Sequence, residues 1–220
     1  TSSSRQNRAA MEKLFAAAEG DFILAMEGAV ATEADGFYNV IGRYRGKPVT
    51  AKDAIESLGE KAAYVIAVGA CAADGGVSAA APNQGKCYGV QAMLSRKVIR
   101  LPGCPCHPDW FMGTLAYILL HGEPELDQRN RPLLFYSTLI HDLCPRRRYF
   151  EQKVFATKLG EKECMLKLGC RGPVTRVDCP ILRWNNGVNW PIGASSPCIG
   201  CAMFGFPDQM EPFINYHTTK

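Results

Sequence analysis

Cysteines and one histidine are the residues of this 220-residue chain whose types and spacing could do chemistry. Cys198-Ile199-Gly200-Cys201 has the C-x-x-C spacing that suits tetrahedral zinc or one edge of an iron–sulfur cluster. His141-Asp142-Leu143-Cys144 repeats this separation with an imidazole in place of one thiol. The chain has ten cysteines, most of them after residue 140: Cys71, Cys87, Cys104, Cys106, Cys144, Cys164, Cys170, Cys179, Cys198 and Cys201.

The thiols between these two pairs predict that the last third of the chain holds two ligand sites. Cys164 and Cys170 bracket a short step that contains Gly169, and Cys179 stands alone before the final pair. Metal ligands often arrive as one short-range pair with distant partners, as they do here. An even number of cysteines also permits disulfides. We favour metal or iron–sulfur ligation because the first two thirds of the chain has enough apolar residues to fold without disulfides.

Buried strands that alternate with helices predict how the earlier ligands are positioned. Strands are expected at 22–26, 63–68 and 97–101, and helices at 5–18, 50–58, 89–95 and 108–120. This order predicts an α/β fold with a parallel, doubly wound sheet. Glu27, Cys71 and Cys104 each come just after a predicted strand. Because functional groups gather at the carboxyl ends of parallel strands, we expect all three at one edge of the sheet.

The alternation stops near residue 138, which predicts a domain boundary. The rest of the chain is rich in Cys, Pro, Gly, Trp and Asn, and 149–159 is the one stretch with some helix or strand periodicity. So irregular a segment buries little apolar area to offset its ordering entropy, and bound clusters would supply the missing core. We therefore predict a sheet domain over 1–138 and an irregular cluster domain over 139–220.

The composition excludes several classes of protein. Apolar residues make up 47% and charged residues 21%, as in a folded globular chain. A net charge of +4 does not indicate nucleic-acid binding. No apolar stretch approaches the roughly 20 residues of a membrane span. The chain begins without Met and without a hydrophobic signal region, so we expect either that the initiator Met was removed or that an upstream segment exists.

From about residue 27 to residue 213, the sequence resembles the small, electron-transferring subunit of nickel–iron hydrogenases. Each motif alone is weakly specific, but their combination in this order is highly specific. The motifs are Glu27-Gly28-Ala29, Gly69-Ala70-Cys71, Pro102-Gly103-Cys104-Pro105, the run from Leu139 to Cys144, the run from Leu168 to Pro173, Trp190-Pro191, and the run from Pro197 to Cys201. The resemblance implies a flavodoxin-like parallel-sheet domain followed by an irregular iron–sulfur domain.

The resemblance also implies which residues hold each cluster. The ligands of a distal [4Fe-4S] cluster would be His141, Cys144, Cys164 and Cys170. The ligands of a medial [3Fe-4S] cluster would be Cys179, Cys198 and Cys201. Pro191 stands where a fourth medial thiol could be, and proline cannot ligate iron. A proximal cluster would use Cys71 and Cys104, with Glu27 as a candidate proton relay.

The proximal set departs from the family pattern. The family has two further proximal ligands in an upstream C-x-x-C-like element, and no cysteine precedes Cys71 here. We expect an upstream segment with this pair, which would complete a proximal [4Fe-4S] cluster. The alternative is a protein that has lost or rebuilt this cluster. Oxygen-tolerant members carry a cysteine at the position of Gly76, which argues against a tolerant type of cluster here.

The family's activity would make this chain an electron relay. Electrons would pass between a nickel–iron centre on a large partner subunit, where H2 is converted, and a cytochrome or ferredoxin-type partner. Arg146, Arg147 and Arg148 would either steer an acidic electron partner or form a solvated basic turn. We expect a periplasmic or membrane-associated location through partners, with the cytoplasm as the alternative.

Two other hypotheses stay open from the sequence. Cys71 and Cys104-Pro105 also resemble the cluster-bearing subunit of respiratory complex I, which lacks the array from His141 to Cys201. A zinc-stabilised, non-redox binding protein could use the same thiols structurally. The three tryptophans, Trp110, Trp184 and Trp190, are expected to be core or subunit-interface aromatics.

Overall fold

The computed structural model describes residues 2–17 and 21–208. The chain forms two compact units, residues 1–100 and residues 101–220. The domain boundary predicted after residue 138 was placed where the alternation of strands and helices stops in the sequence, and it stays a prediction. Each unit is described by itself below.

A three-stranded sheet organises the first unit. Its strands are β1 (Ile23–Glu27), β5 (Tyr64–Val68) and β7 (Ile99–Leu101), in the order β1-β5-β7. β1 and β5 run parallel, with Ile23 opposite Tyr64 and Glu27 opposite Val68. The predicted α/β fold with a parallel sheet is confirmed. The near-continuous apolar run of β5 suits a strand that is covered on both faces.

Three helices pack in this unit; the first two lie at predicted positions, whereas no helix was predicted for the third. They are α1 (Ser2–Ala17), α2 (Ala51–Gly59) and α3 (Gly69–Asp74). α2 begins with a capping box, in which Thr50 Oγ1 accepts the Asp53 N–H at 3.0 Å and Asp53 Oδ2 accepts the Thr50 N–H at 3.2 Å. Ile55 and Leu58 of α2 pack with Val65 of β5 in the core of this unit. The local cap and the apolar face together explain why the helix begins at Ala51.

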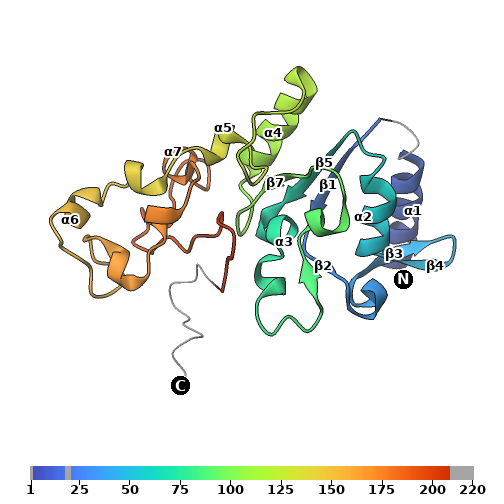
Figure 1. The fold of residues 1–220 in the computed structure, drawn as a ribbon, viewed down its shortest axis with the longest axis horizontal. Helices are drawn as coiled ribbons and strands as arrows, with labels where there is room; N and C mark the ends of the chain where they lie inside the picture. The colour runs from blue at the N-terminus through green and yellow to red at the C-terminus, as the bar shows by residue number, and fades with distance from the viewer. Residues whose placement is uncertain (1, 18–20, 209–220) are drawn as a thin grey trace. The chain divides into compact units, whose positions relative to one another are not determined.

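Short paired strands and 3-10 helices complete the first unit. β3 (Val40–Tyr44) and β4 (Lys47–Thr50) form an antiparallel hairpin, which lies beside α1 (Figure 1). β2 (Val30–Ala31) pairs with β6 (Cys87–Tyr88), and the 3-10 helices are η1 (Glu33–Asn39), η2 (Gly76–Ala79) and η3 (Val90–Met93). The prediction of a helix over 89–95 is therefore wrong in extent, because only the single 3-10 turn of η3 forms there.

The second unit has one long helix and many short ones. α4 (Pro108–His121) is confirmed, and α5 (Leu133–Tyr136) follows it. The shorter helices are η4 (Ile140–Leu143), α6 (Arg147–Glu151), η5 (Met165–Leu168), η6 (Gly172–Val174) and α7 (Cys179–Leu182). The helical pattern over 149–159 was misplaced, since α6 begins earlier and ends at Glu151. Trp110 and Tyr136 are almost fully buried, and the Tyr136 hydroxyl donates to the Pro102 carbonyl at 2.9 Å.

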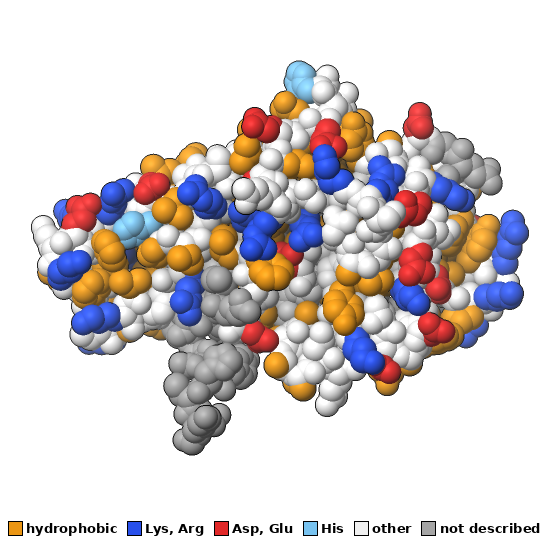
Figure 2. Space-filling view, viewed as in Figure 1, with side chains coloured by type: hydrophobic (Ala, Val, Ile, Leu, Met, Phe, Trp, Pro, Cys, Tyr) orange, Lys and Arg blue, Asp and Glu red, His pale blue; other side chains and the backbone are white. Residues whose placement is uncertain are grey.

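The surface mixes charges of both signs. Figure 2 shows Lys and Arg side chains interspersed with Asp and Glu side chains and with smaller apolar groups over the face in view. Such a surface agrees with the small net charge of +4. Within residues 2–17 and 21–208, no helix is both long and apolar enough to cross a membrane.

Candidate metal centres

The three residues predicted to hold a medial cluster meet at one cavity of the second unit. The cavity has a volume of about 330 Å³, and Cys179, Cys198 and Cys201 line it together with Pro191. Cys179 is the first residue of α7, whereas Cys198 and Cys201 come from a loop. Gly200 between them has φ +75°, which favours glycine and turns the chain so that both thiols reach the cavity. The structure thus brings together the three residues that the resemblance assigns to a medial cluster.

Hydrogen-bond donors point at each of these three sulfur atoms. The Trp184 side chain donates to Cys179, the Gly200 backbone N–H donates to Cys198, and the Cys104 backbone N–H donates to Cys201. A thiol is a weak acceptor, but a thiolate is a good one. Three donors aimed at sulfur therefore suit anionic, metal-bound cysteines.

Burial makes free thiolates unfavourable in this cavity. It raises the pKa of Cys179 to about 12 and the pKa of Cys198 to about 12, and it raises the pKa of Cys201 as well. The cause is desolvation, which penalises the charged form. Ligating cysteines must lose their protons, so a bound cation would have to compensate for this cost. The donor set of this pocket accordingly fits a positively charged, thiophilic group.

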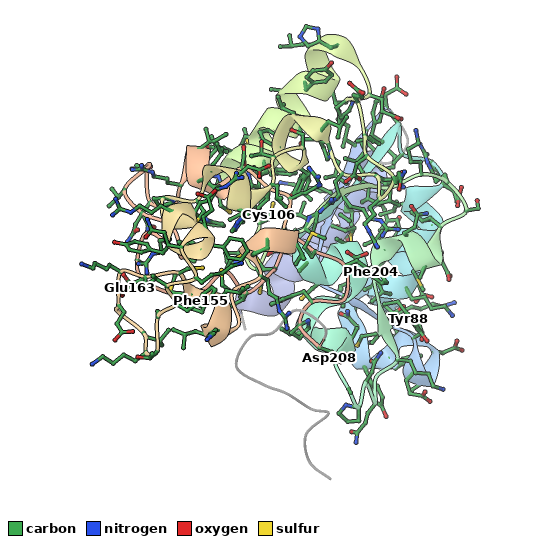
Figure 3. All side chains as sticks on the ribbon, turned by 60° about the vertical axis from the view of Figure 1, so that its left-hand side comes forward. Tyr88, Cys106, Phe155, Glu163, Phe204 and Asp208 are labelled. Atoms are coloured by element: carbon green, nitrogen blue, oxygen red, sulfur yellow. The ribbon has the colours of Figure 1, made fainter. Side chains whose placement is uncertain are left out.

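The four residues predicted to hold a distal cluster line a second, smaller cavity of about 20 Å³. They are His141, Cys144, Cys164 and Cys170. The His141 ring packs edge-on against Phe150, with the ring centroids 4.6 Å apart. A bridge between Phe155 and Cys164, with the Ala156 N–H donating to the Cys164 carbonyl at 2.9 Å, closes this part of the fold; Phe155 and Glu163 mark it in Figure 3. The three thiols and the imidazole at this second cavity are side chains of the types that ligate iron or zinc.

Backbone N–H groups also point at sulfur atoms in this second set. Cys170 Sγ accepts the N–H of Gly172 at 3.5 Å and the N–H of Cys198 at 3.4 Å. The Arg146 N–H donates to Cys144 Sγ. Burial again raises the pKa of both thiols, against these bonds. In both cavities, hydrogen-bond donors therefore point at buried or partly buried sulfur atoms.

Arg146 anchors the wall of this second cavity rather than facing solvent. Its guanidinium donates to the carbonyls of Glu161 and Glu163 and to Ser195 Oγ at 2.8 Å. Arg147 is exposed and pairs with Asp142 and Glu151, and the Arg148 guanidinium lies over the ring of Tyr149. The three arginines therefore do not act as one patch: Arg146 is structural, and its two neighbours lie at the surface.

The predicted proximal residues fall in both units. Glu27 ends β1 and is exposed, and its partner Val68 is the last residue of β5, directly before the helix that carries Cys71. These two residues therefore lie at the same edge of the sheet, as predicted. Gly76 packs on Cys71, because a Cβ at this glycine would lie 2.9 Å from Cys71 Sγ. Cys104, in the second unit, is exposed and lines the larger cavity.

The cysteines of the described residues are free thiols. All ten cysteines lie in the described residues, and none forms a disulfide. Among residues 2–17 and 21–208, no three His, Cys, Asp or Glu side chains come close enough to hold a single metal ion. A closed zinc site needs four ligands about 2.0–2.3 Å from one ion. The thiols here instead stand around cavities, an arrangement that suits a group of several atoms.

Two residues at the larger cavity escaped the sequence-based prediction. Trp184 lines the cavity and reaches a ligand sulfur, whereas Trp110 and Trp190 are buried as expected. Thr175 also lines the cavity, and its side chain contacts Cys198. The sequence holds one weak signal for Thr175, namely its place between the ligand candidates Cys170 and Cys179.

Comparison with protein-family models gives two matches along the chain. Residues 136–214 match the model for the C-terminal part of NiFe/NiFeSe hydrogenase small subunits. Residues 3–118 match the model for the 20 Kd subunit of NADH ubiquinone oxidoreductase. The segment that contains the array from His141 to Cys201 is therefore the part with the hydrogenase match.

Curated relatives and solved structures agree with the first of these matches. The periplasmic [NiFe] hydrogenase small subunit of Solidesulfovibrio fructosivorans is 39% identical over 212 residues, which are 93% of this chain and 66% of the relative. The periplasmic [NiFeSe] hydrogenase small subunit of Desulfomicrobium baculatum is 37% identical over 211 residues, 88% of this chain and 67% of that relative. The chain thus spans about two thirds of the length of these relatives.

The fold is similar over most of the chain as well. The structure of a reduced, active form of the Ni-Fe-Se hydrogenase from Desulfomicrobium baculatum superposes with a TM-score of 0.88 at 37% sequence identity. The superposition covers 94% of this chain and 81% of that one. Sequence, fold and the placement of the thiols agree, and the chain belongs to the family of [NiFe] and [NiFeSe] hydrogenase small subunits.

Proposed function

We propose that this chain is the electron-transferring small subunit of a nickel–iron hydrogenase. The observation that carries the proposal is the presence of two cavities lined by predicted ligands, each with hydrogen-bond donors directed at buried sulfur atoms. In the proposed assembly, H2 is converted on a large partner subunit to two protons and two electrons. This chain then carries the electrons to an external acceptor.

The two cavities would hold clusters of different nuclearity. Cys179, Cys198 and Cys201 would hold a [3Fe-4S] cluster, since Pro191, which cannot ligate iron, stands where the family could have a fourth medial thiol and Cys104 at the same cavity is assigned to the proximal set. Around the smaller cavity, His141, Cys144, Cys164 and Cys170 would hold a [4Fe-4S] cluster. Cys71 and Cys104 would contribute to a third, proximal [4Fe-4S] cluster, together with a cysteine pair from an upstream segment.

Iron–sulfur clusters bound at these places would supply one-electron redox chemistry, which splits the electron pair from H2 into single steps. The protein tunes that chemistry through ligand charge, burial and hydrogen bonds to sulfur. His141 is a neutral ligand where a thiolate would be anionic, so it makes its site less negative and raises the potential. Glu27, exposed at the edge that carries Cys71, is proposed as a proton relay.

The family and its relatives also suggest the partners. A hydrogenase large subunit is the proposed permanent partner, and a cytochrome or ferredoxin-type protein is the proposed acceptor. The exposed Arg147 and Arg148 lie beside Cys144, on the surface near the distal set, where they could attract an acidic partner. A periplasmic location is proposed because the Solidesulfovibrio and Desulfomicrobium relatives are named as periplasmic.

Metal analysis of the assembled protein tests the proposal. The chain is co-produced with a hydrogenase large subunit and purified without oxygen. We expect brown protein with iron and acid-labile sulfide in comparable amounts. Colourless protein that contains zinc, or that lacks both iron and sulfide, would end the case for an electron relay.

A substitution at Pro191 tests the medial assignment. Pro191→Cys supplies a fourth thiol to the medial set, so the EPR signal of an oxidised three-iron cluster should disappear and a four-iron signal should replace it. Pro191→Ala is the matched control, because it removes the proline without adding a ligand, and should keep the three-iron signal. An unchanged signal in Pro191→Cys would contradict the assignment.

A substitution at His141 tests the distal assignment. His141→Ala should slow electron exchange with external dyes much more than it slows H/D isotope exchange, because isotope exchange needs only the partner's centre. Equal loss of both activities would contradict a role at the exit of the chain. Tyr149→Phe, close in sequence but outside the ligand set, serves as the control and should leave both rates unchanged.

A further inference from the structure

Thr175 is a buried polar residue that lines the larger cavity. It is 1% exposed and follows η6, between the ligand candidates Cys170 and Cys179. Its backbone is fixed on both sides, since its N–H donates to the Gly172 carbonyl at 3.4 Å and its carbonyl accepts the Ile140 N–H at 2.9 Å. A side chain on so constrained a backbone has little freedom to move away from its neighbours.

The Thr175 hydroxyl lies between a carbonyl of the distal segment and a sulfur of the medial set. It donates to the Arg171 carbonyl at 2.7 Å, and Cys198 Sγ lies 3.8 Å from Thr175 Oγ1 with the thiol as donor. The Arg171 N–H in turn donates to the Cys198 carbonyl at 2.7 Å. Three hydrogen bonds therefore close a ring through Thr175, Arg171 and Cys198.

Ligation of Cys198 would change the direction of one bond in this ring. A thiolate bound to iron has no proton to give, so the contact with Thr175 persists only if the hydroxyl donates to the sulfur. The hydroxyl carries a single proton, and the anionic sulfur and the Arg171 carbonyl compete for it. Reduction adds negative charge at the sulfur and so favours the bond to Cys198.

We propose that Thr175 sets the reduction potential of the medial site by donating its hydroxyl hydrogen bond to the Cys198 sulfur. A hydrogen bond that is stronger in the reduced state stabilises that state and raises the potential. This inference rests on the proposed function, since it needs a redox group held by Cys179, Cys198 and Cys201. Thr175 is a positioning residue rather than a ligand.

Trp184 donates a side-chain hydrogen bond to the sulfur of Cys179, five residues before it. Its ring is held by His107, whose ring lies edge-on to it with a centroid distance of 4.6 Å. His107 Nδ1 accepts the Asp109 N–H at 3.1 Å, so Nε2 carries the proton and donates to the Arg183 carbonyl at 2.6 Å. This bond fixes the turn that presents Trp184 to the cavity. Trp184 thus donates to one medial sulfur in this structure, and Thr175 would donate to a second once Cys198 is ligated.

A matched pair of substitutions tests the role of Thr175. Thr175→Val keeps the shape and loses the hydroxyl, whereas Thr175→Ser keeps the hydroxyl. The midpoint potential of the medial site is measured by EPR-monitored redox titration of the anaerobic complex with the large subunit. Loss of one hydrogen bond should shift the redox equilibrium by about tenfold toward the oxidised state, which is about 59 mV for one electron. Thr175→Ser should stay within error of the unsubstituted protein.

The possible outcomes separate this inference from the proposed function. A Thr175→Val complex with normal iron content and an unshifted midpoint potential would overturn the inference about Thr175. Equal potential shifts in Thr175→Val and Thr175→Ser would also overturn it, because they would indicate a change in packing rather than the loss of a hydrogen bond. Should Thr175→Val not assemble, Thr175→Ala removes the same hydroxyl without adding a branched methyl and decides the question by the same titration. Trp184→Phe should lower the potential independently. If the unsubstituted complex contains no cluster at all, the proposed function itself fails.

Discussion

The backbone N–H of Cys198 donates a hydrogen bond to the sulfur of Cys170 at 3.4 Å. One of these cysteines belongs to each proposed ligand set, and the Arg171 N–H returns a bond to the Cys198 carbonyl at 2.7 Å. The two sets are therefore joined by direct hydrogen bonds as well as by the chain. A substitution in one ligand set should therefore alter the structure or stability of the other set through these hydrogen bonds.

Removing the Cys170 sulfur should loosen the segment around Cys198. Cys170→Ala deprives the Cys198 N–H of its acceptor, and a hydrogen bond worth about 0.5–1.5 kcal/mol predicts roughly threefold to tenfold faster amide exchange there. Cys144→Ala removes another thiol of the same set, whose sulfur accepts from Arg146 instead. Hydrogen-exchange mass spectrometry should show the faster exchange at 197–202 in the first variant alone. Equal effects in both would mean that the coupling runs through the whole cavity.

A side chain at Gly76 should disturb the segment that carries Cys71. A Cβ there would lie 2.8 Å from the Cys71 nitrogen and 2.9 Å from Cys71 Sγ, on a backbone with φ +50°. Gly76→Ala should therefore lower the free energy of unfolding by about 1–3 kcal/mol beyond the cost of the positive φ. Gly46→Ala measures that cost alone, because φ is +83° and its Cβ meets nothing within 4 Å. Urea unfolding of both variants gives the difference, and equal losses would contradict the close contact.

Arg146 and Arg147 are neighbours with opposite expected effects on stability. Arg146→Gln removes charged hydrogen bonds to Glu161, Glu163 and Ser195, and should cost about 2–3 kcal/mol of unfolding free energy. Arg147→Gln breaks only exposed ion pairs and should change it by less than about 0.5 kcal/mol. Denaturant titrations of both variants decide this. A large loss of unfolding free energy in Arg147→Gln would show that the exposed ion pairs stabilise the fold more than the hydrogen bonds of the partly buried Arg146 guanidinium do.

The pair of Asp127 and Arg131 should make stability depend on acidic pH. Burial alone would raise the pKa of Asp127, but the N–H groups of Arg131 and Arg129 and the Arg131 guanidinium outweigh it and hold the pKa below 3.8. Arg131 Nη1 also donates to the Ala202 carbonyl at 2.9 Å, next to Cys201. The pair therefore anchors the loop that carries the last C-x-x-C element.

The direction of this pH dependence follows from the lowered pKa. The folded state favours the carboxylate more than the unfolded state does, so the stabilisation is complete above pH 4 and is lost as the pH falls through the folded pKa. Asp127→Asn should be less stable than the unsubstituted chain at pH 7, and the gap should narrow toward pH 2. Unfolding curves between these limits test this, and a gap that stays constant with pH would contradict the ionic contribution.

Local sequence signals were enough to place the regular elements of the fold. Thr50 and Asp53, three residues apart, form the capping box of α2, and the strands β1 and β5 stand out in the sequence as short runs of apolar residues. The order of strand and helix then predicts the parallel sheet, and the strand ends place Glu27 and Cys71 at one edge. The short helices α3 and η5 escaped prediction, and η3 is shorter than the helix predicted there, because one or two turns have little periodicity to detect.

The sequence by itself determined which thiols and which imidazole are candidate ligands, and through their order it determined the family. Only the tertiary structure decided what faces their sulfur atoms. Cys170 and Cys198 are 28 residues apart, and His107 holds the turn before Trp184 from 76 residues away. Hydrogen bonds at such separations depend on how the irregular segments pack, and local pattern carries no record of that packing. The contacts of Thr175 with Cys198 and of Trp184 with Cys179 therefore became known only from the tertiary structure.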